Sequence, residues 1–206
     1  TETTRTLHGT TKMFLAKDTY NTLMFLFTML MGLPFPITPI QISWASFATT
    51  NISGGLIALG ILRPAPIKNF RDDVLDYFII AGVIGGVGLA FANFVIFSYT
   101  DRDTARHAMT LSFMLYQLTI LWNMAGMDLL RPRTFINNPL VVTFSVILSL
   151  LTIGAAWLFP AIFEFQLPPW EIIGFVLLVH LLLMVLVSVG LRNRGVLHRF
   201  YALTRR

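Results

Sequence analysis

The chain has 206 residues, of which 55% are hydrophobic and only 12% are charged, and its mean hydropathy is +0.72. So little charge cannot cover the surface of a soluble domain, and the composition therefore predicts an all-α membrane protein. The absence of cysteine excludes disulfides and thiolate sites, and the net charge of +5 does not indicate nucleic-acid binding, because the basic residues lie at the ends of apolar segments.

Six apolar stretches follow a polar start at residues 1–12, which contains no initiator methionine, so we expect a piece of a longer protein. Proline-rich or polar turns separate the stretches, and a helix that crosses a bilayer needs roughly 20 apolar residues. The expected spans are residues 13–33, 40–62, 74–97, 105–130, 139–163 and 170–191, and a basic tail follows at 192–206. These spans fill the chain and predict a six-transmembrane-helix bundle without a separate soluble catalytic domain.

The basic residues predict the orientation of the bundle. Of the 15 Lys and Arg residues, all but Arg102 and Arg106 lie near the chain ends or in the second and fourth loops. Cytoplasmic loops of membrane proteins carry an excess of Lys and Arg. We therefore expect both termini to be cytoplasmic, in agreement with an even number of spans, in a multi-pass protein of the plasma membrane.

Two polar residues in the first span, Asp18 and Asn21, are spaced so that they share one face of a helix. Their side chains supply oxygen ligands that suit a hard cation. Because polar groups are costly inside a bilayer, this pair is a candidate cation site. The alternative is that Asp18, together with Lys17, only marks the cytoplasmic end of the span.

The second span carries a stripe of hydroxyl side chains followed by two glycines. The stripe recurs with the spacing of one helix face, at Ser46, Thr49, Thr50 and Ser53. Gly54 and Gly55 weaken the helix, so that an unwound carbonyl at this place could coordinate an ion. The stripe is equally suited to helix–helix contact, since Ser and Thr also bond to carbonyls of their own helix.

The remaining spans carry fewer polar residues. Gln117 lies in the fourth span, and His180 in the sixth is a lone histidine, for which a hydrogen bond to a neighbour is more typical than metal binding. Gly82 and Gly86 in the third span form a GxxxG pair, which predicts close contact with another helix. The sequence contains no P-loop, GxSxG or HExxH motif, and it offers no candidate catalytic residue.

The stretch LMGLPFPITPIQISWASFATTN at 30–51 resembles P-type cation-transporting ATPases, at the turn between their fifth and sixth membrane helices and into the sixth. The family pattern is approximately GLP, then P-[ILV]-Q-[IL]-x-W, then N-x-x-T-D. KMFLAKDTYNTL at 12–23 is similar to the start of the fifth helix in a bacterial, calcium-pump-like subgroup. AGVIGGVGLA at 81–90 is similar to the seventh helix, and ARHAMTLSFMLYQLTILWN at 105–123 to the eighth. The resemblance covers nearly the whole chain, as helices five to ten.

The resemblance implies a set of cation ligands in the fifth, sixth and eighth helices of such a pump. These positions fall on Asp18, Asn21, Ser46, Thr49, Thr50 and Gln117. Ser46 and Thr50 stand where the family has Asn and Asp, so one ion or a monovalent ion is favoured over a pair of calcium ions. Calcium stays possible, because the bacterial subgroup also lacks this Asp.

The resemblance also implies what must be supplied from elsewhere. The chain contains no DKTGT phosphorylation motif, nucleotide-binding domain or actuator domain, and no helices one to four. We therefore expect the membrane domain of an ATP-driven cation pump, with lipid, a cation and the N-terminal half of the pump as partners. It would hold no cofactor and could not hydrolyse ATP alone, because ATP and Mg²⁺ would bind to the other half. Two alternatives stay open: a stand-alone six-helix channel or carrier, and a non-transporting assembly or regulatory membrane protein.

Overall fold

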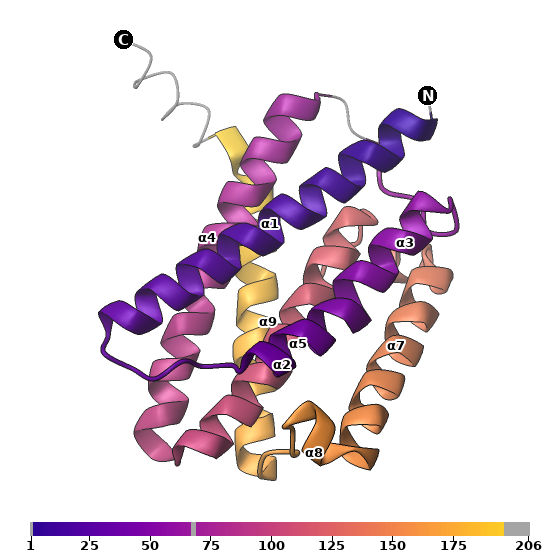
Figure 1. Ribbon diagram of the computed structural model, residues 1–206. Coiled ribbons are helices and arrows are strands. Elements are labelled where there is room, and N and C mark those ends of the chain that lie inside the picture. Colours follow the sequence, from indigo (N-terminus) through magenta and orange to yellow (C-terminus); the bar gives the residue numbers. More distant parts are fainter. Residues whose placement is uncertain (1, 67–68, 196–206) are drawn as a thin grey trace.

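The computed structural model describes residues 2–66 and 69–195, and this part of the chain contains helices and turns but no strand (Figure 1). The long helices are α1 (Glu2–Leu30), α4 (Phe70–Tyr99), α5 (Arg102–Met124), α7 (Pro139–Leu158) and α9 (Trp170–Arg192). A sixth rod consists of α2 (Pro39–Ser46), the π-helical segment η1 (Phe47–Asn51) and α3 (Ile52–Ala58). Two short helices lie in the connections, α6 (Arg133–Ile136) and α8 (Pro160–Phe163). The predicted all-α class is therefore confirmed for the described residues.

Three of the helices are long and apolar enough to cross a membrane. They comprise Asp73–Tyr99, Pro139–Leu158 and Trp170–Arg192, with mean hydropathies of 2.2, 2.2 and 3.0. These helices indicate a membrane protein, as the composition predicts. The other three rods do not meet the same criterion of length and apolarity, and the number of spans stays a prediction.

The helix bounds differ from the expected spans most at three places. Helix α1 already begins at Glu2, because the segment expected to be a polar tail contains no proline and continues the helix. Helix α5 ends at Met124, because Gly126 adopts a φ of 79° and stops the helix. Helix α7 ends at Leu158, because Pro160 disfavours helical backbone in the residue before it.

The six rods alternate in direction, so that the connections gather at two ends of the array (Figure 1). We call one of them the basic end: it contains the start of α1, the connections 59–66 and 125–138, and the last turn of α9. An ion pair of 2.5 Å between Arg194 and Asp73 joins the segment after α9 to α4 at this end. The opposite end contains the connections between α1 and α2, between α4 and α5, and between α7 and α9.

Glycines allow α4 to pack closely against its neighbours. A Cβ atom on Gly82 would lie 2.4 Å from Thr19 of α1, and one on Gly86 would lie 2.4 Å from Leu23. The two helices therefore touch through their backbones, which confirms the close contact predicted from the GxxxG pair. Two further glycines of α4 play the same part toward α5 and α9, namely Gly85 and Gly88.

Helix α5 is the central helix of the array. It contacts α1, the rod formed by α2 and η1, α4 and α9, and most of its residues are buried. Tyr116 and Phe113 are fully buried and pack edge-on against Tyr20 of α1, with ring centroids 5.0 and 5.7 Å apart. A helix surrounded in this way is able to carry polar side chains that a lipid-facing helix could not.

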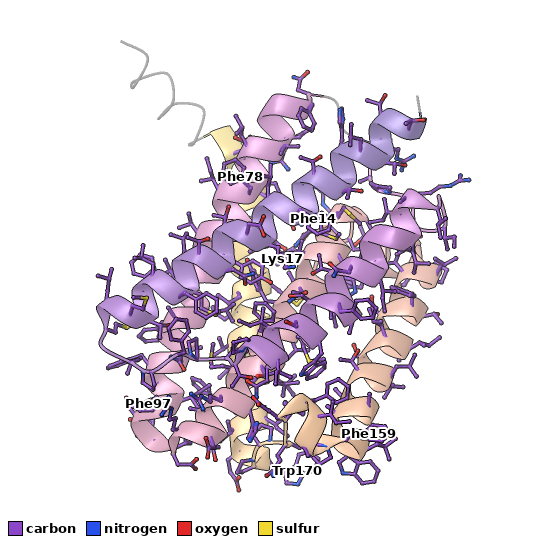
Figure 2. All side chains as sticks on the ribbon, viewed as in Figure 1. Phe14, Lys17, Phe78, Phe97, Phe159 and Trp170 are labelled. Carbon is purple, nitrogen blue, oxygen red and sulfur yellow. The ribbon has the colours of Figure 1, made fainter. Side chains whose placement is uncertain are left out.

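The outer faces of α7 and α9 are apolar and exposed. Leu150 and Leu151 are about two-thirds exposed on α7, as is Leu178 on α9. At the opposite end, Phe159 and Trp170 point away from the array (Figure 2). Exposed aliphatic faces with aromatic residues at one end are typical of helices that face lipid.

Candidate functional site

The rod α2–η1–α3 begins with a capping box at Thr38. The main-chain amide of Gln41 donates to the Thr38 hydroxyl at 3.3 Å, and the main-chain amide of Thr38 donates to Gln41 Oε1 at 2.9 Å. Pro39 occupies the first helical position, where no amide proton is needed. These local signals fix where the rod starts, and therefore which of its side chains face α5.

The rod changes to π-helical geometry at Phe47–Asn51 and returns to an α-helix at Ile52. The sequence predicts a weak point at Gly54 and Gly55, but α3 runs regularly through both glycines, so the irregular turn lies earlier than expected. The Thr49 hydroxyl lies 2.6 Å from the Ala45 carbonyl and competes there with the main chain. π-Helical turns are rare in proteins and occur frequently at functional sites.

The π-helical segment contacts Gln117 of α5. The Thr49 and Thr50 hydroxyls both lie within short hydrogen-bonding distance of Gln117 Oε1. Because a π-helical turn holds more residues than an α-helical turn, two consecutive residues differ less in direction and both reach the same partner. All three side chains are buried, at 3%, 4% and 4% exposure. We call these three residues the polar cluster.

The hydrogen bonds of the polar cluster are not fixed in one direction. A hydroxyl has one proton, so Thr49 donates either to Gln117 or to the Ala45 carbonyl, which is equally within reach. The side-chain amide of Gln117 accepts through Oε1. If the amide group were flipped, so that Oε1 and Nε2 exchanged places, it would donate through Nε2 instead. In that second arrangement the amide oxygen becomes available to another ligand. The cluster is therefore able to offer oxygen lone pairs without a change in the helices.

Further buried polar atoms flank the polar cluster. Ser46 lies one turn before Thr49 on the same face of the rod, and Tyr20 of α1 is fully buried beside Gln117. Ser46 Oγ, Asn21 Oδ1 and Gln117 Nε2 are buried and make no hydrogen bond within the described part of the chain. Buried polar atoms without a partner are costly, and such atoms call for an additional ligand. Five of the six predicted ligand positions thus provide buried polar atoms between α1, the rod and α5.

Asp18 is the predicted ligand that the structure places differently. It lies on an exposed face of α1, one turn before Asn21. The neighbouring Lys17 lies with its ammonium group 5.9 Å from the centre of the Phe14 ring. The predicted ligands other than Asp18 all have neutral side chains. Among the described residues, no group of three or more His, Cys, Asp or Glu side chains could hold a metal ion.

One buried acidic side chain was not predicted from the sequence. Asp76 of α4 is only 1% exposed, although its carboxylate lies within an expected span. Its position near the end of an apolar stretch gave the only signal. His180, by contrast, behaves as predicted: its Nε2 atom lies 3.3 Å from the Thr119 hydroxyl, within hydrogen-bonding distance.

Comparison with protein-family models, with curated proteins and with solved structures finds no match to this chain.

Proposed function

We propose that this chain is the membrane domain of an ATP-driven cation pump of the P-type class. It crosses the plasma membrane six times, has both termini in the cytoplasm, and contributes part of the ion site and pathway. The observation that carries the proposal is the contact of Thr49 and Thr50 with Gln117 at the π-helical segment. The resemblance of the sequence to the pump family implies the same three residues as cation ligands, so geometry and resemblance support one location.

The distribution of hydropathy supports six spans. The three rods that are less apolar than a typical span are α1, α2–η1–α3 and α5, and these are the rods that carry the polar cluster and the buried polar atoms that flank it. Polar side chains in a bilayer almost always face the interior of a bundle. Helices α4, α7 and α9 are apolar enough to face lipid themselves. The lower hydropathy of the other three rods is what a buried ion pathway requires.

The chemistry of the polar cluster favours a monovalent cation, or a single ion. The oxygen atoms come from hydroxyl and amide groups, which carry no net charge. A divalent cation that loses its water in a low dielectric needs negative ligands to offset the cost. Asp18 is the one carboxylate among the predicted ligands, and it is exposed in this chain. Calcium binding would require that Asp18 turns toward the site in the intact pump.

The remaining parts of the pump would act on this domain through the rod. In the proposed machine, ATP and Mg²⁺ bind to cytosolic domains of the N-terminal half, where an aspartate is phosphorylated. Movement of that half would bend the rod at η1, where the regular α-helical ladder is already interrupted. Such a bend would separate Thr49 and Thr50 from Gln117 and thereby change the affinity for the cation.

The test is phosphoenzyme formation by the full-length protein, with Na⁺, K⁺, Ca²⁺, Mg²⁺ and Mn²⁺ offered one at a time. We expect one of these cations to stimulate phosphorylation, and we expect Gln117→Leu to raise the concentration required by about tenfold, which corresponds to about 1.4 kcal/mol. The matched control is Ser112→Ala, which removes a buried hydroxyl of the same helix that bonds to the Ala108 carbonyl of its own helix. Absence of a cation-stimulated phosphoenzyme would refute the proposal.

One observation favours a second candidate, a non-transporting membrane protein. The Thr49 and Ser53 hydroxyls bond to carbonyls of their own helix, as they do where they serve only helix packing. In that case the unfolding free energy of the chain would not depend on any cation. It would also be equally insensitive to cations in Asp18→Ala and Thr49→Ala variants.

A further inference from the structure

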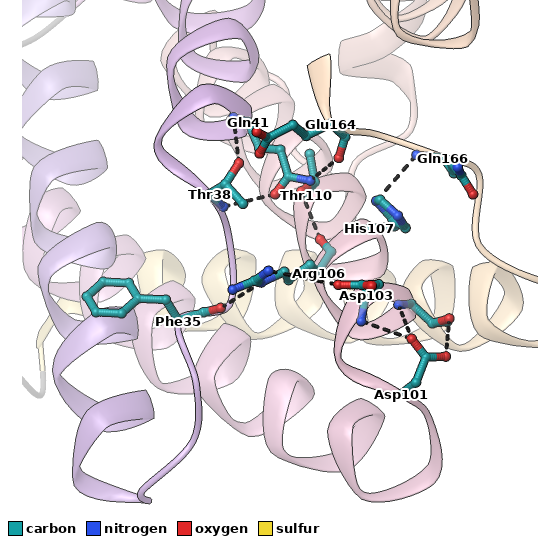
Figure 3. A network of polar contacts seen from close by, with 11 residues as sticks. Phe35, Thr38, Gln41, Asp101, Asp103, Arg106, His107, Thr110, Glu164 and Gln166 are labelled. Atoms are coloured by element: carbon teal, nitrogen blue, oxygen red, sulfur yellow. Dashed lines mark hydrogen bonds and ion pairs between the residues drawn. The ribbon is translucent and has the colours of Figure 1, made fainter. Parts of the chain in front are cut away.

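The connection between α7 and α9 is held by the same two elements that form the polar cluster. Four consecutive residues make these contacts, and we call residues 163–166 the strap. Figure 3 shows the strap residue Glu164 beside Gln41 of the rod, and the strap residue Gln166 beside His107 of α5. The strap lies at the opposite end, away from the basic end of the array (Figure 1).

The rod holds two carbonyl groups of the strap. Trp44 Nε1 donates to the Phe163 carbonyl at 3.2 Å, and Gln41 Nε2 donates to the Glu164 carbonyl at 2.5 Å. Gln41 and Trp44 are one helical turn apart, so they act from the same side of the rod. Gln41 is only 1% exposed, and its other amide atom is already used in the capping box. Both polar atoms of the Gln41 side chain therefore make hydrogen bonds, which fix its orientation.

Helix α5 holds the other half of the strap. The main-chain amide of Gln166 donates a hydrogen bond to His107 Nδ1 at 3.3 Å. Between these two attachments, the Phe165 ring is 1% exposed and packs edge-on against Trp44 and His107, with ring centroids 5.8 and 5.9 Å apart. The strap thus joins the rod to α5 through hydrogen bonds at both ends and one buried ring in the middle.

The backbone of the strap is strained at Glu164, which has a φ of 50° without being glycine. A left-handed conformation is unfavourable for a residue with a Cβ atom. It persists where the surrounding structure determines it, and here the Gln41 side chain holds the carbonyl of the strained residue. Release of the strap would also release this strain.

The strap and the polar cluster connect the same two elements at different levels. Gln41 precedes Thr49 by two helical turns, about 12 Å, and His107 precedes Gln117 by about 15 Å along α5, since each residue adds 1.5 Å. A change in separation at the strap is therefore transmitted along two short helical segments to the hydrogen bonds of the cluster.

We propose that the strap sets the separation between the rod and α5, and with it the geometry of the polar cluster, and that protonation of His107 releases the strap. The first part rests on the described contacts alone, and its consequence for a cation rests on the proposed function. Gln41, Trp44 and His107 are positioning residues in this scheme, because they touch the strap and not the ion. The pH of the solution at the opposite end of the array would then change the geometry of the polar cluster.

The chemistry of the imidazole supplies the switch. Nδ1 accepts the Gln166 proton only while it carries none itself, and in the imidazolium form both ring nitrogens are donors. The bond is therefore present at high pH and lost as the pH falls through the titration of His107. Partial burial of the ring opposes its protonation, the Asp103 and Asp101 carboxylates favour the protonated form, and the Arg106 guanidinium opposes it.

Protons reach the imidazole from outside. His107 lines an open hollow of about 450 Å³ at the opposite end, together with Asp103, Arg106 and Glu164. Arg106 lies 3.9 Å from Asp103 and donates to the Phe35 carbonyl at 3.5 Å, so it is held beside the hollow by α5 and the α1–α2 connection (Figure 3). The rod contributes only neutral groups to the hollow, from Thr38 and Gln41.

The experiment uses the whole chain in lipid nanodiscs, with one spin label at the start of the rod and one at the start of α5. The chain contains no cysteine, so Ile40→Cys and Arg102→Cys give two unique labels on exposed residues. We expect a narrow distance distribution at about pH 8 that broadens at about pH 5, the range in which histidine titrates. His107→Asn keeps an acceptor in the position of Nδ1 at all pH values, so its distribution should stay narrow at both.

Two results would overturn the proposal: a wild-type distribution that does not respond to pH, or a His107→Asn distribution that broadens as the wild type does. The variant retains all the neighbouring carboxylates, so it separates their titration from that of His107. A second readout is the cation dependence of thermal unfolding at both pH values. If no cation stabilises the chain at either pH, the proposed function fails, while the spin labels still decide whether the strap is a pH-dependent latch.

Discussion

The ring of Tyr116 lies directly over Gly85, where α5 crosses α4. A Cβ atom on Gly85 would lie 2.2 Å from the tyrosine ring, which is far less than any real contact. The Tyr116 hydroxyl extends past the glycine and donates a hydrogen bond of 2.5 Å to the Ala81 carbonyl. Because Gln117 is the next residue, this contact also sets the rotation of α5 that directs Gln117 toward the rod.

Substitution of Gly85 by alanine should therefore destabilise the chain, because the new methyl group would push Tyr116 away from α4. We expect a loss of about 1–3 kcal/mol, as for other overpacked sites. Gly154→Ala is the matched control, since nothing lies within 4 Å of its Cβ position in α7 and alanine is the better helix former. The unfolding free energy in detergent checks this, and equal stability of the two variants would contradict the contact.

Thr50 and Gln117 should be energetically coupled in the chain without any ligand. In a double-mutant cycle with Thr50→Val and Gln117→Leu, we expect a coupling of about 1 kcal/mol, typical of a buried hydrogen bond between membrane helices. The same cycle with Ser112→Ala in place of Thr50→Val should show none, because Ser112 bonds to its own helix. Additive effects of the first pair would mean that the hydrogen bond contributes nothing.

Lys12 should make the stability of the chain depend on pH above neutrality. Burial lowers its pKa to about 8, Arg194 acts in the same direction, and Asp73 opposes them. An unfolded lysine titrates near 10.4, so between about pH 8 and 10.4 the unfolded chain binds more protons and stability rises with pH. Below about pH 8 the full cost of the buried charge is present.

The Lys12→Met variant should therefore be more stable than the wild type at pH 7 and should lose the rise at high pH. The pKa difference corresponds to about 3 kcal/mol, and loss of the contact with the Tyr77 ring, at 4.1 Å, offsets about 1 kcal/mol. Unfolding free energies measured across this pH range check the result. An unchanged slope in the variant would assign the dependence to another group.

Under the proposed function, Asp18 should matter only in the full-length protein. Because its side chain is exposed, Asp18→Asn should change the unfolding free energy of this chain by less than about 0.5 kcal/mol. In the full-length protein the same change should weaken cation-stimulated phosphorylation, if the carboxylate completes the site. Glu171→Gln, at another exposed carboxylate, is the control for loss of charge. Equal effects of both changes on phosphorylation would exclude Asp18 as a ligand.

Features with a local signature could be predicted from the sequence. The contact at Gly82 and Gly86 follows from small residues at a spacing of four. The rod begins at Pro39, one residue from the expected start of the span at residue 40. The hydroxyl stripe was visible from its period, but its partner was not. Gln117 was singled out by resemblance, because nothing in its own neighbourhood indicates which helix it faces.

Features that depend on distant residues could not be predicted. The strap binds to side chains more than 50 positions away in the chain, and a carbonyl that accepts a hydrogen bond leaves no mark on the sequence. The π-helical segment at Phe47–Asn51 contains neither glycine nor proline, so it gave no sign of irregularity. The buried position of Asp76 depends on how the neighbouring helices pack around α4.

The backbone contact between α1 and α4 has a consequence for how such a chain enters a membrane during synthesis. Helix α1 is not apolar enough to count as a span by itself, whereas α4, which comes later in the chain, is. The glycines of α4 offer α1 a surface to which it can attach. If α1 crosses the membrane, as the proposed function requires, we therefore expect its stable integration to depend on α4.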